Sequence, residues 1–150
     1  MTPPEALQGA VLELHHVAIA VRDLAVTTPV YTELLGLAAD GEPEYVADQQ
    51  VDVQVLRAGG QRIELVAPAA EDSPISRFVA KREGLHHLAY RVDDLEATLA
   101  RLKAAGVRLI DEAPRPGAHG TRIAFLHPAA TGGVLTELVE VPEGRDSNHA

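Results

Sequence analysis

Two pairs of adjacent histidines and two glutamates set in apolar runs are the residues of this sequence best suited to chemistry. The histidine pairs are His15-His16 and His86-His87, and the glutamates are Glu64 and Glu137. Imidazole nitrogens and carboxylate oxygens together bind divalent ions such as Fe²⁺, Co²⁺, Ni²⁺, Mn²⁺ or Zn²⁺. The sequence contains no cysteine, which excludes thiolate catalysis and disulfides and leaves histidine and carboxylate as the metal-binding side chains.

These residues occur twice in the same order because the sequence repeats itself. Residues 15–24 match residues 86–95 at an offset of 71, and residues 59–66 match residues 132–139 at an offset of 73. Two matches in one order at nearly the same offset indicate two copies of a module of about seventy residues.

The first copy predicts a strand, a helix and three further strands. The first strand is expected at 15–21, and Asp23 caps a helix that ends near Gly36. Pro29 lies inside this helix and is expected to kink or shorten it. The other strands are expected at 37–46, 51–57 and 61–67.

The second copy predicts the same elements. Asp93 or Asp94 caps a helix from Leu95 to Ala105, which Gly106 ends. Its later strands are expected at 107–112, 121–126 and 134–141, with a loop at 114–120 and a short helix opening at Ser73-Pro74 between the copies. The sequence therefore predicts an α+β fold of two tandem βαβββ modules. One domain is expected over 1–150, with module one at 14–68, module two at 85–142 and an inter-module segment at 69–84.

The repeat places the same chemistry at matching positions of both modules. An approximate two-fold relation between them would bring two imidazoles and two carboxylates to one cleft, where they could bind a single ion. Side chains alternate along a strand, so only one histidine of each pair can face that cleft, and the pattern leaves open which one. A single histidine or glutamate in a strand is more often structural, but the coincidence in both copies favours a metal site.

Composition excludes several classes of function. A formal charge of −9 and 3% aromatic residues disfavour nucleic-acid binding. No apolar run approaches the roughly 20 residues that a membrane span requires. The first residues show no secretory signal, so we expect a cytoplasmic protein.

The sequence resembles the methylmalonyl-CoA epimerase family of the vicinal-oxygen-chelate superfamily, which also contains glyoxalase I, extradiol dioxygenases and bleomycin-resistance proteins. The resemblance runs from Leu14 to Val141 and is carried by residues 15–24, 63–68, 72–75, 84–87, 117–120, 125–128 and 133–138. The superfamily pattern alone says little about function. The Ser-Pro-Ile, Gly-Ala-His-Gly and Phe-Leu-His-Pro segments are more specific to the epimerases.

The resemblance implies paired βαβββ modules that enclose a divalent ion, usually in a homodimer, with Co²⁺ or Mn²⁺ favoured. It implies four metal ligands and so selects the second histidine of each pair: His16, Glu64, His87 and Glu137. It also implies an acyl-CoA substrate and substrate-binding roles for Ser73, Gly117, His119 and His127. The last two residues could instead hold their loop.

The activity so implied is metal-dependent epimerisation of (2R)- and (2S)-methylmalonyl-CoA, by α-proton transfer through a metal-stabilised enolate. Epimerisation needs a base on one face of the carbon and an acid on the other. Some family members have Gln in place of Glu64 and carry a second carboxylate where this sequence has Val53; Asp52 is one residue off and should face the opposite side. We therefore expect Glu64 and Glu137 to be the catalytic pair.

Three alternatives share the fold. A glyoxalase I-like lyase would use the same four ligands, although the epimerase-specific segments argue against it. An extradiol dioxygenase would use His16, His87 and Glu137, and Glu64 counts against it because dioxygen and a catechol need three open positions. A metal-free binding protein of the bleomycin-resistance kind would typically lack this set of ligands.

Overall fold

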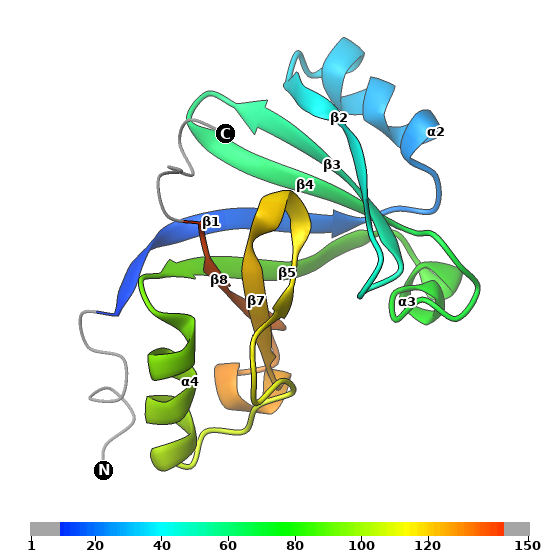
Figure 1. Cartoon of the computed structure of the whole chain (residues 1–150). Helices are drawn as coiled ribbons and strands as arrows, with labels where there is room; N and C mark the ends of the chain where they lie inside the picture. Colours follow the sequence, from blue (N-terminus) through cyan, green and yellow to red (C-terminus); the bar gives the residue numbers. More distant parts are fainter. Residues whose placement is uncertain (1–9, 143–150) are drawn as a thin grey trace. The chain divides into compact units, whose positions relative to one another are not determined.

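The computed structural model describes residues 10–142, which divide into two compact units (Figure 1). We call residues 16–86 the N-terminal unit, and residues 10–15 with 87–142 the C-terminal unit. The division falls inside two strands, β1 (Val11–Ala20) and β5 (Gly84–Val92). In the part of the chain that is described, no helix has the length and apolar character needed to cross a membrane.

The N-terminal unit contains one βαβββ module, and its strands follow the order β2-β3-β4-β1. After β1 come α2 (Leu24–Pro29), the π-helical turn η1 (Val30–Leu34), β2 (Ala38–Val46), β3 (Val51–Ala58), β4 (Gln61–Pro68) and α3 (Ser76–Lys81). Strands β2, β3 and β4 are antiparallel neighbours, as Figure 1 shows for the long β3–β4 hairpin, and β4 runs parallel to β1.

The predicted helix of this unit begins and ends for the expected reasons. The side chain of Asp23 accepts a hydrogen bond from the backbone N–H of Ala25 at 2.9 Å, which confirms the predicted cap. Pro29 has no N–H to donate to the preceding turn, so α2 ends there and continues as the wider turn η1. Gly36, at φ +77°, then lets the chain leave the helix.

Only one face of these strands packs against the helix. The buried cluster on that face contains Leu56, Leu65 and Ala67, with Ile63 and Tyr31 packed against it. Because residues of a strand alternate between faces, the residues between Ile63, Leu65 and Ala67 on β4 point to the other face. That second face is therefore available for polar side chains.

The C-terminal unit repeats the arrangement, with strand order β5-β8-β7-β6. After β5 come α4 (Leu95–Ala104), β6 (Arg115–Pro116), η2 (Ala118–Gly120), β7 (Arg122–Leu126), η3 (Pro128–Thr131) and β8 (Thr136–Glu140). Strand β5 is parallel to β8, while β8, β7 and β6 are antiparallel neighbours. The α+β fold with two βαβββ modules is thus confirmed.

Helix α4 covers one face of these strands through its apolar stripe. Leu95, Leu99 and Leu102 are buried against Ala124 and Leu138. The Asp94 side chain caps the helix by accepting a hydrogen bond from Ala97 N–H at 3.0 Å. This cap selects Asp94 over Asp93, which the sequence left open.

The strand predicted at 107–112 is wrong. Only one isolated bridge, between Leu109 and Leu126, forms there. The reason is Asp111, whose carboxylate accepts the backbone N–H of Phe125 at 2.9 Å and so takes the place of a backbone carbonyl. The strand that pairs with the other end of β7, at Arg122 and Ile123, is β6, which lies inside the segment predicted to be a loop.

Glu140 at the end of β8 links the helix to the strands. Its Oε2 accepts the backbone N–H of Leu95 at 2.9 Å, and its Oε1 accepts Nε of Arg122 at 2.9 Å. Partial burial raises the pKa of Glu140, but the hydrogen bonds from Arg122 and Leu95 outweigh this effect and hold the pKa below its ordinary value.

We expect Glu140→Gln to lower the free energy of unfolding by about 1–2 kcal/mol at neutral pH, because an amide accepts these bonds less strongly than a carboxylate. A depressed folded-state pKa means that the stabilisation is present above the unfolded pKa and is lost as pH falls through the folded pKa. The difference between variant and wild type should therefore shrink in acid, as measured by urea denaturation.

The control is Glu96→Gln, since Glu96 pairs with Nη1 of the same Arg122 at 3.0 Å but its side chain is 68% exposed. Glu96→Gln should lower the free energy of unfolding by less than Glu140→Gln does. Equal stability of Glu140→Gln and wild type at neutral pH would contradict the structural role.

Candidate metal site and its surroundings

Strand pairing in the N-terminal unit places His16 and Glu64 on one face. The parallel register of β1 and β4 sets Ala18 opposite Glu64. His16, two residues before Ala18, shares that face by strand alternation. Nδ1 of His16 lies 3.3 Å from Oε2 of Glu64, and the two side chains are only 5% and 9% exposed.

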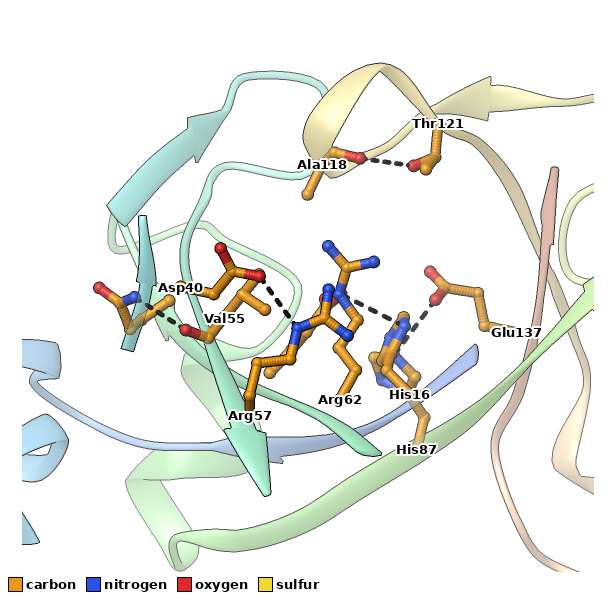
Figure 2. A network of polar contacts seen from close by, with 11 residues as sticks. His16, Asp40, Val55, Arg57, Arg62, His87, Ala118, Thr121 and Glu137 are labelled. Carbon is orange, nitrogen blue, oxygen red and sulfur yellow. Dashed lines mark hydrogen bonds and ion pairs between the residues drawn. The ribbon is translucent and has the colours of Figure 1, made fainter. Parts of the chain in front are cut away.

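The C-terminal unit repeats this arrangement with the same register. Strands β5 and β8 set Ala89 opposite Glu137, so His87 shares the face of Glu137. Nε2 of His87 lies 3.4 Å from Oε1 of Glu137, and Figure 2 shows the contact. The His87 ring also packs edge-on against Phe125, with centroids 5.2 Å apart.

The spacing of the donor atoms within each pair suits a shared metal ion. Two ligand atoms about 2.0–2.2 Å from one ion, at octahedral or tetrahedral angles, are roughly 3.0–3.5 Å apart. The donors are a nitrogen and an oxygen, and both are buried. His16 with Glu64 and His87 with Glu137 belong to groups of side chains that could hold a metal ion, and the first group also includes His15. The residues present therefore fit a divalent ion.

A buried arginine beside Glu64 is a feature that the sequence analysis missed. Arg62 is 7% exposed, and its Nε lies 3.5 Å from Oε2 of Glu64. Burial lowers the pKa of Arg62 and Glu64 opposes that shift, but a guanidinium keeps its proton at neutral pH. Arg62 stands two residues before Glu64, so strand alternation alone could have placed both on one face.

Arg62 has a second arginine as its neighbour across the β3–β4 ladder. Arg57 is its direct partner in the register. Arg57 donates from Nε to Oδ2 of Asp40 at 2.9 Å, an ion pair that Figure 2 shows. Two positive and two negative groups are thus held together on strands β2, β3 and β4.

The position where some relatives carry a second carboxylate is apolar here. Val53 is 4% exposed and pairs with Val66. Asp52, on the opposite face of β3 by strand alternation, lines a cavity of about 680 Å³ with Asp23 and Gln54. Neither residue places a carboxylate on the face of Glu64.

Ser73 lies in the turn before α3, which begins at Ser76 rather than at the predicted Ser73-Pro74. Its carbonyl accepts the N–H of Ser76 at 3.0 Å, and its side chain is 5% exposed. Among the residues that the structure describes, its Oγ is buried with no hydrogen-bond partner. A buried hydroxyl of this kind is well suited to a bound ligand.

The predicted substrate loop is tightly folded around Gly117. Its N–H donates to the carbonyl of Thr121 at 2.9 Å, and Thr121 Oγ1 donates to the carbonyl of Ala118 at 2.7 Å (Figure 2). A Cβ at residue 117 would lie 2.6 Å from Thr121 Oγ1 and 2.8 Å from Ile123 Cγ2, so only glycine fits there. His119 adopts a left-handed backbone at φ 59°.

His127 has a structural role in this unit. Its Nδ1 accepts the backbone N–H of Ala129 at 3.0 Å and so caps the short helix η3. The contact supports the alternative in which this histidine holds its loop.

Comparisons with known proteins agree with this geometry. Residues 15–125 match the Glyoxalase/Bleomycin resistance protein/Dioxygenase superfamily. An ethylmalonyl-CoA/methylmalonyl-CoA epimerase from Cereibacter sphaeroides is 42% identical over 85% of this chain and 97% of its own.

Solved structures give the same result. The methylmalonyl-CoA epimerase from Mycobacterium tuberculosis superposes with a TM-score of 0.82 at 42% identity, covering 89% of this chain and 90% of its own. A methylmalonyl-CoA epimerase in complex with methylmalonyl-CoA and NH4+ superposes with a TM-score of 0.81 at 34% identity, covering 89% and 97%.

The two histidine pairs provide a test of this register. We expect His16→Ala and His87→Ala each to weaken Co²⁺ binding by about tenfold or more, because each would remove a proposed nitrogen ligand. His15→Ala and His86→Ala should keep Co²⁺ affinity and lose roughly 1–3 kcal/mol of stability if the ring is hydrogen-bonded. Calorimetric Co²⁺ titration and thermal denaturation measure the two effects. A loss of affinity in His15→Ala equal to that in His16→Ala would overturn the assignment.

Proposed function

We propose that this chain, which belongs to the Glyoxalase/Bleomycin resistance protein/Dioxygenase superfamily and within it to the methylmalonyl-CoA epimerase family, interconverts (2R)- and (2S)-methylmalonyl-CoA. Members of that family are isomerases. The observation that carries the proposal is the identical His–Glu pairing, in the same strand register, in both units.

The proposal includes one divalent ion, Co²⁺ or Mn²⁺, bound by His16, Glu64, His87 and Glu137. Buried nitrogen and oxygen donors spaced 3.3 and 3.4 Å apart within each pair support it. When bound, the ion supplies positive charge that stabilises negative charge on the substrate oxygens as the α-proton leaves.

Glu64 and Glu137 transfer the proton in this proposal. An ionised carboxylate on one face of the α-carbon accepts the proton, and a protonated carboxyl on the other face returns one with inversion. The apolar environment at Val53 supports Glu64 as the base contributed by the N-terminal unit. Asp40 is less suited to this role because it is bonded to Arg57.

The substrate-binding part of the proposal involves Ser73, Gly117, His119 and His127. The buried Ser73 hydroxyl would bond an oxygen of the acyl-CoA. Gly117 keeps the loop close to Thr121 and Ile123, where a larger residue would displace the backbone. The following expectations from the sequence stay predictions: a homodimer, a cytoplasmic location, the absence of nucleic-acid and membrane partners, and the module bounds 14–68 and 85–142.

Deuterium exchange tests the reaction directly. In D2O, the protein should exchange the α-proton of both methylmalonyl-CoA epimers and interconvert them, as followed by NMR. EDTA should stop the exchange, and Co²⁺ or Mn²⁺ should restore it. Circular dichroism should stay unchanged, because a chain of this size buries roughly 70% of its unfolded surface without help from an ion.

Ethylmalonyl-CoA and a glutathione hemithioacetal serve as comparison substrates. Turnover of the hemithioacetal without exchange on either acyl-CoA would replace the proposal by a glyoxalase activity. Unfolding on addition of EDTA would show that the ion is structural.

Glu64→Gln separates proton transfer from metal binding. The amide oxygen can still bind the ion, but it cannot accept a proton at neutral pH. We expect Co²⁺ to remain bound while epimerisation is abolished, as measured by metal analysis and by exchange. Glu33→Gln, at an exposed position of η1, is the control and should be fully active. Near-normal turnover by Glu64→Gln would exclude Glu64 as a base.

A further inference from the structure

We propose that Arg62 is a positioning residue for Glu64, and this inference rests on the role of Glu64 proposed above. Arg62 holds Oε2 of Glu64, so that Oε1 is the oxygen available to an ion or to a substrate proton. Arg62 Nε and His16 Nδ1 approach that same oxygen, at 3.5 and 3.3 Å.

Besides His16, the direct ladder neighbours of Glu64 do not orient its carboxylate. Its neighbours across the two ladders are Ala18 on β1 and Val55 on β3, which are 0% and 1% exposed and carry no polar side-chain atom. A glutamate side chain has three rotatable bonds, and an ion pair with a buried cation restricts them. Arg62 supplies that positive charge from two residues away on the same strand face, with its Nε 3.5 Å from Oε2 of Glu64.

A neighbouring ion pair offsets the repulsion between Arg62 and Arg57. Arg57 lies directly opposite Arg62, and two like charges at such a position repel each other. Asp40 accepts the 2.9 Å bond from Nε of Arg57 and so offsets this repulsion, while Oε2 of Glu64 lies 3.5 Å from Nε of Arg62. A buried guanidinium requires such a partner, since burial of an uncompensated charge is costly.

A positioning role and a structural role predict opposite effects on metal binding. The positive charge of Arg62 offsets the charge of Glu64 and repels a cation. Its removal should therefore strengthen Co²⁺ binding or leave it unchanged, while the carboxylate loses its fixed orientation and turnover falls. A merely structural residue would weaken both together.

The test compares Arg62→Met and Arg62→Lys with wild type. For Arg62→Met we expect kcat to fall by about tenfold or more with KM nearly constant, because a misplaced base affects the transition state rather than binding. The dissociation constant of Co²⁺ should stay equal or fall, and the visible spectrum of bound Co²⁺ should change. Arg62→Lys should bring the Co²⁺ affinity back towards wild type and restore turnover only in part.

A double-mutant cycle shows whether Arg62 acts through Glu64. In the Glu64→Gln background, Arg62→Met should leave the visible spectrum of bound Co²⁺ unchanged, and only the direct repulsion between Arg62 and the ion should still affect the affinity. The matched control is the charge-neutral pair Asp40→Asn with Arg57→Gln, which removes the neighbouring ion pair and should lower the melting temperature while Co²⁺ affinity is retained.

Wild-type kcat in Arg62→Met, weaker Co²⁺ binding in that variant, or an undiminished effect in the Glu64→Gln background would each overturn the proposal. If wild type shows no epimerisation, the proposed function fails. The Co²⁺ affinity and spectrum of the four proteins in the cycle still decide whether Arg62 orients Glu64.

Discussion

The parallel pairing of the first and last strand of each module is the constraint on which the rest of the arrangement depends. In both units it aligns a glutamate of the proposed metal site with the alanine two residues after the proposed histidine ligand, Ala18 with Glu64 and Ala89 with Glu137. A shift of one residue would move every side chain of a strand to its other face. Histidine and glutamate would then no longer share a face.

Packing on the opposite face holds this register in place. The residues that alternate with the glutamates are buried against a helix, as Leu65 is in the N-terminal unit and Leu138 in the C-terminal unit. Exposing these leucines by a register shift would cost roughly 1.5–3 kcal/mol each. Burial of the hydrophobic face thus stabilises the strand register that places the polar side chains on the other face.

Charged groups on the polar face are compensated locally. Glu64 contacts His16 and Arg62, Arg57 contacts Asp40, and Glu137 contacts His87. In the N-terminal unit this compensation joins residues of β1, β2, β3 and β4. Removal of one partner from such a network leaves a buried charge unpaired, which costs more than the pair contributes.

The repeat in the sequence was enough to predict the βαβββ modules, the caps of the helices and the recurrence of histidine and glutamate, because these depend on local patterns of residue type. The strand expected at 107–112 was wrong because the Asp111 side chain, rather than a backbone carbonyl, accepts the N–H of Phe125 on β7. The residue pattern of 107–112 does not reveal this hydrogen bond, since its donor lies on another segment.

Only the tertiary structure decided which face of the sheet each side chain occupies and which side chains are its neighbours. Strand alternation predicted that one histidine of each pair faces the candidate site, but the β1–β4 register was needed to place His16 with Glu64 from strand pairing. The buried position of Arg62 and its pairing opposite Arg57 likewise depend on β3 and β4. Residue types and their spacing are local properties of the sequence, whereas register and burial arise from contacts between segments that are distant in it.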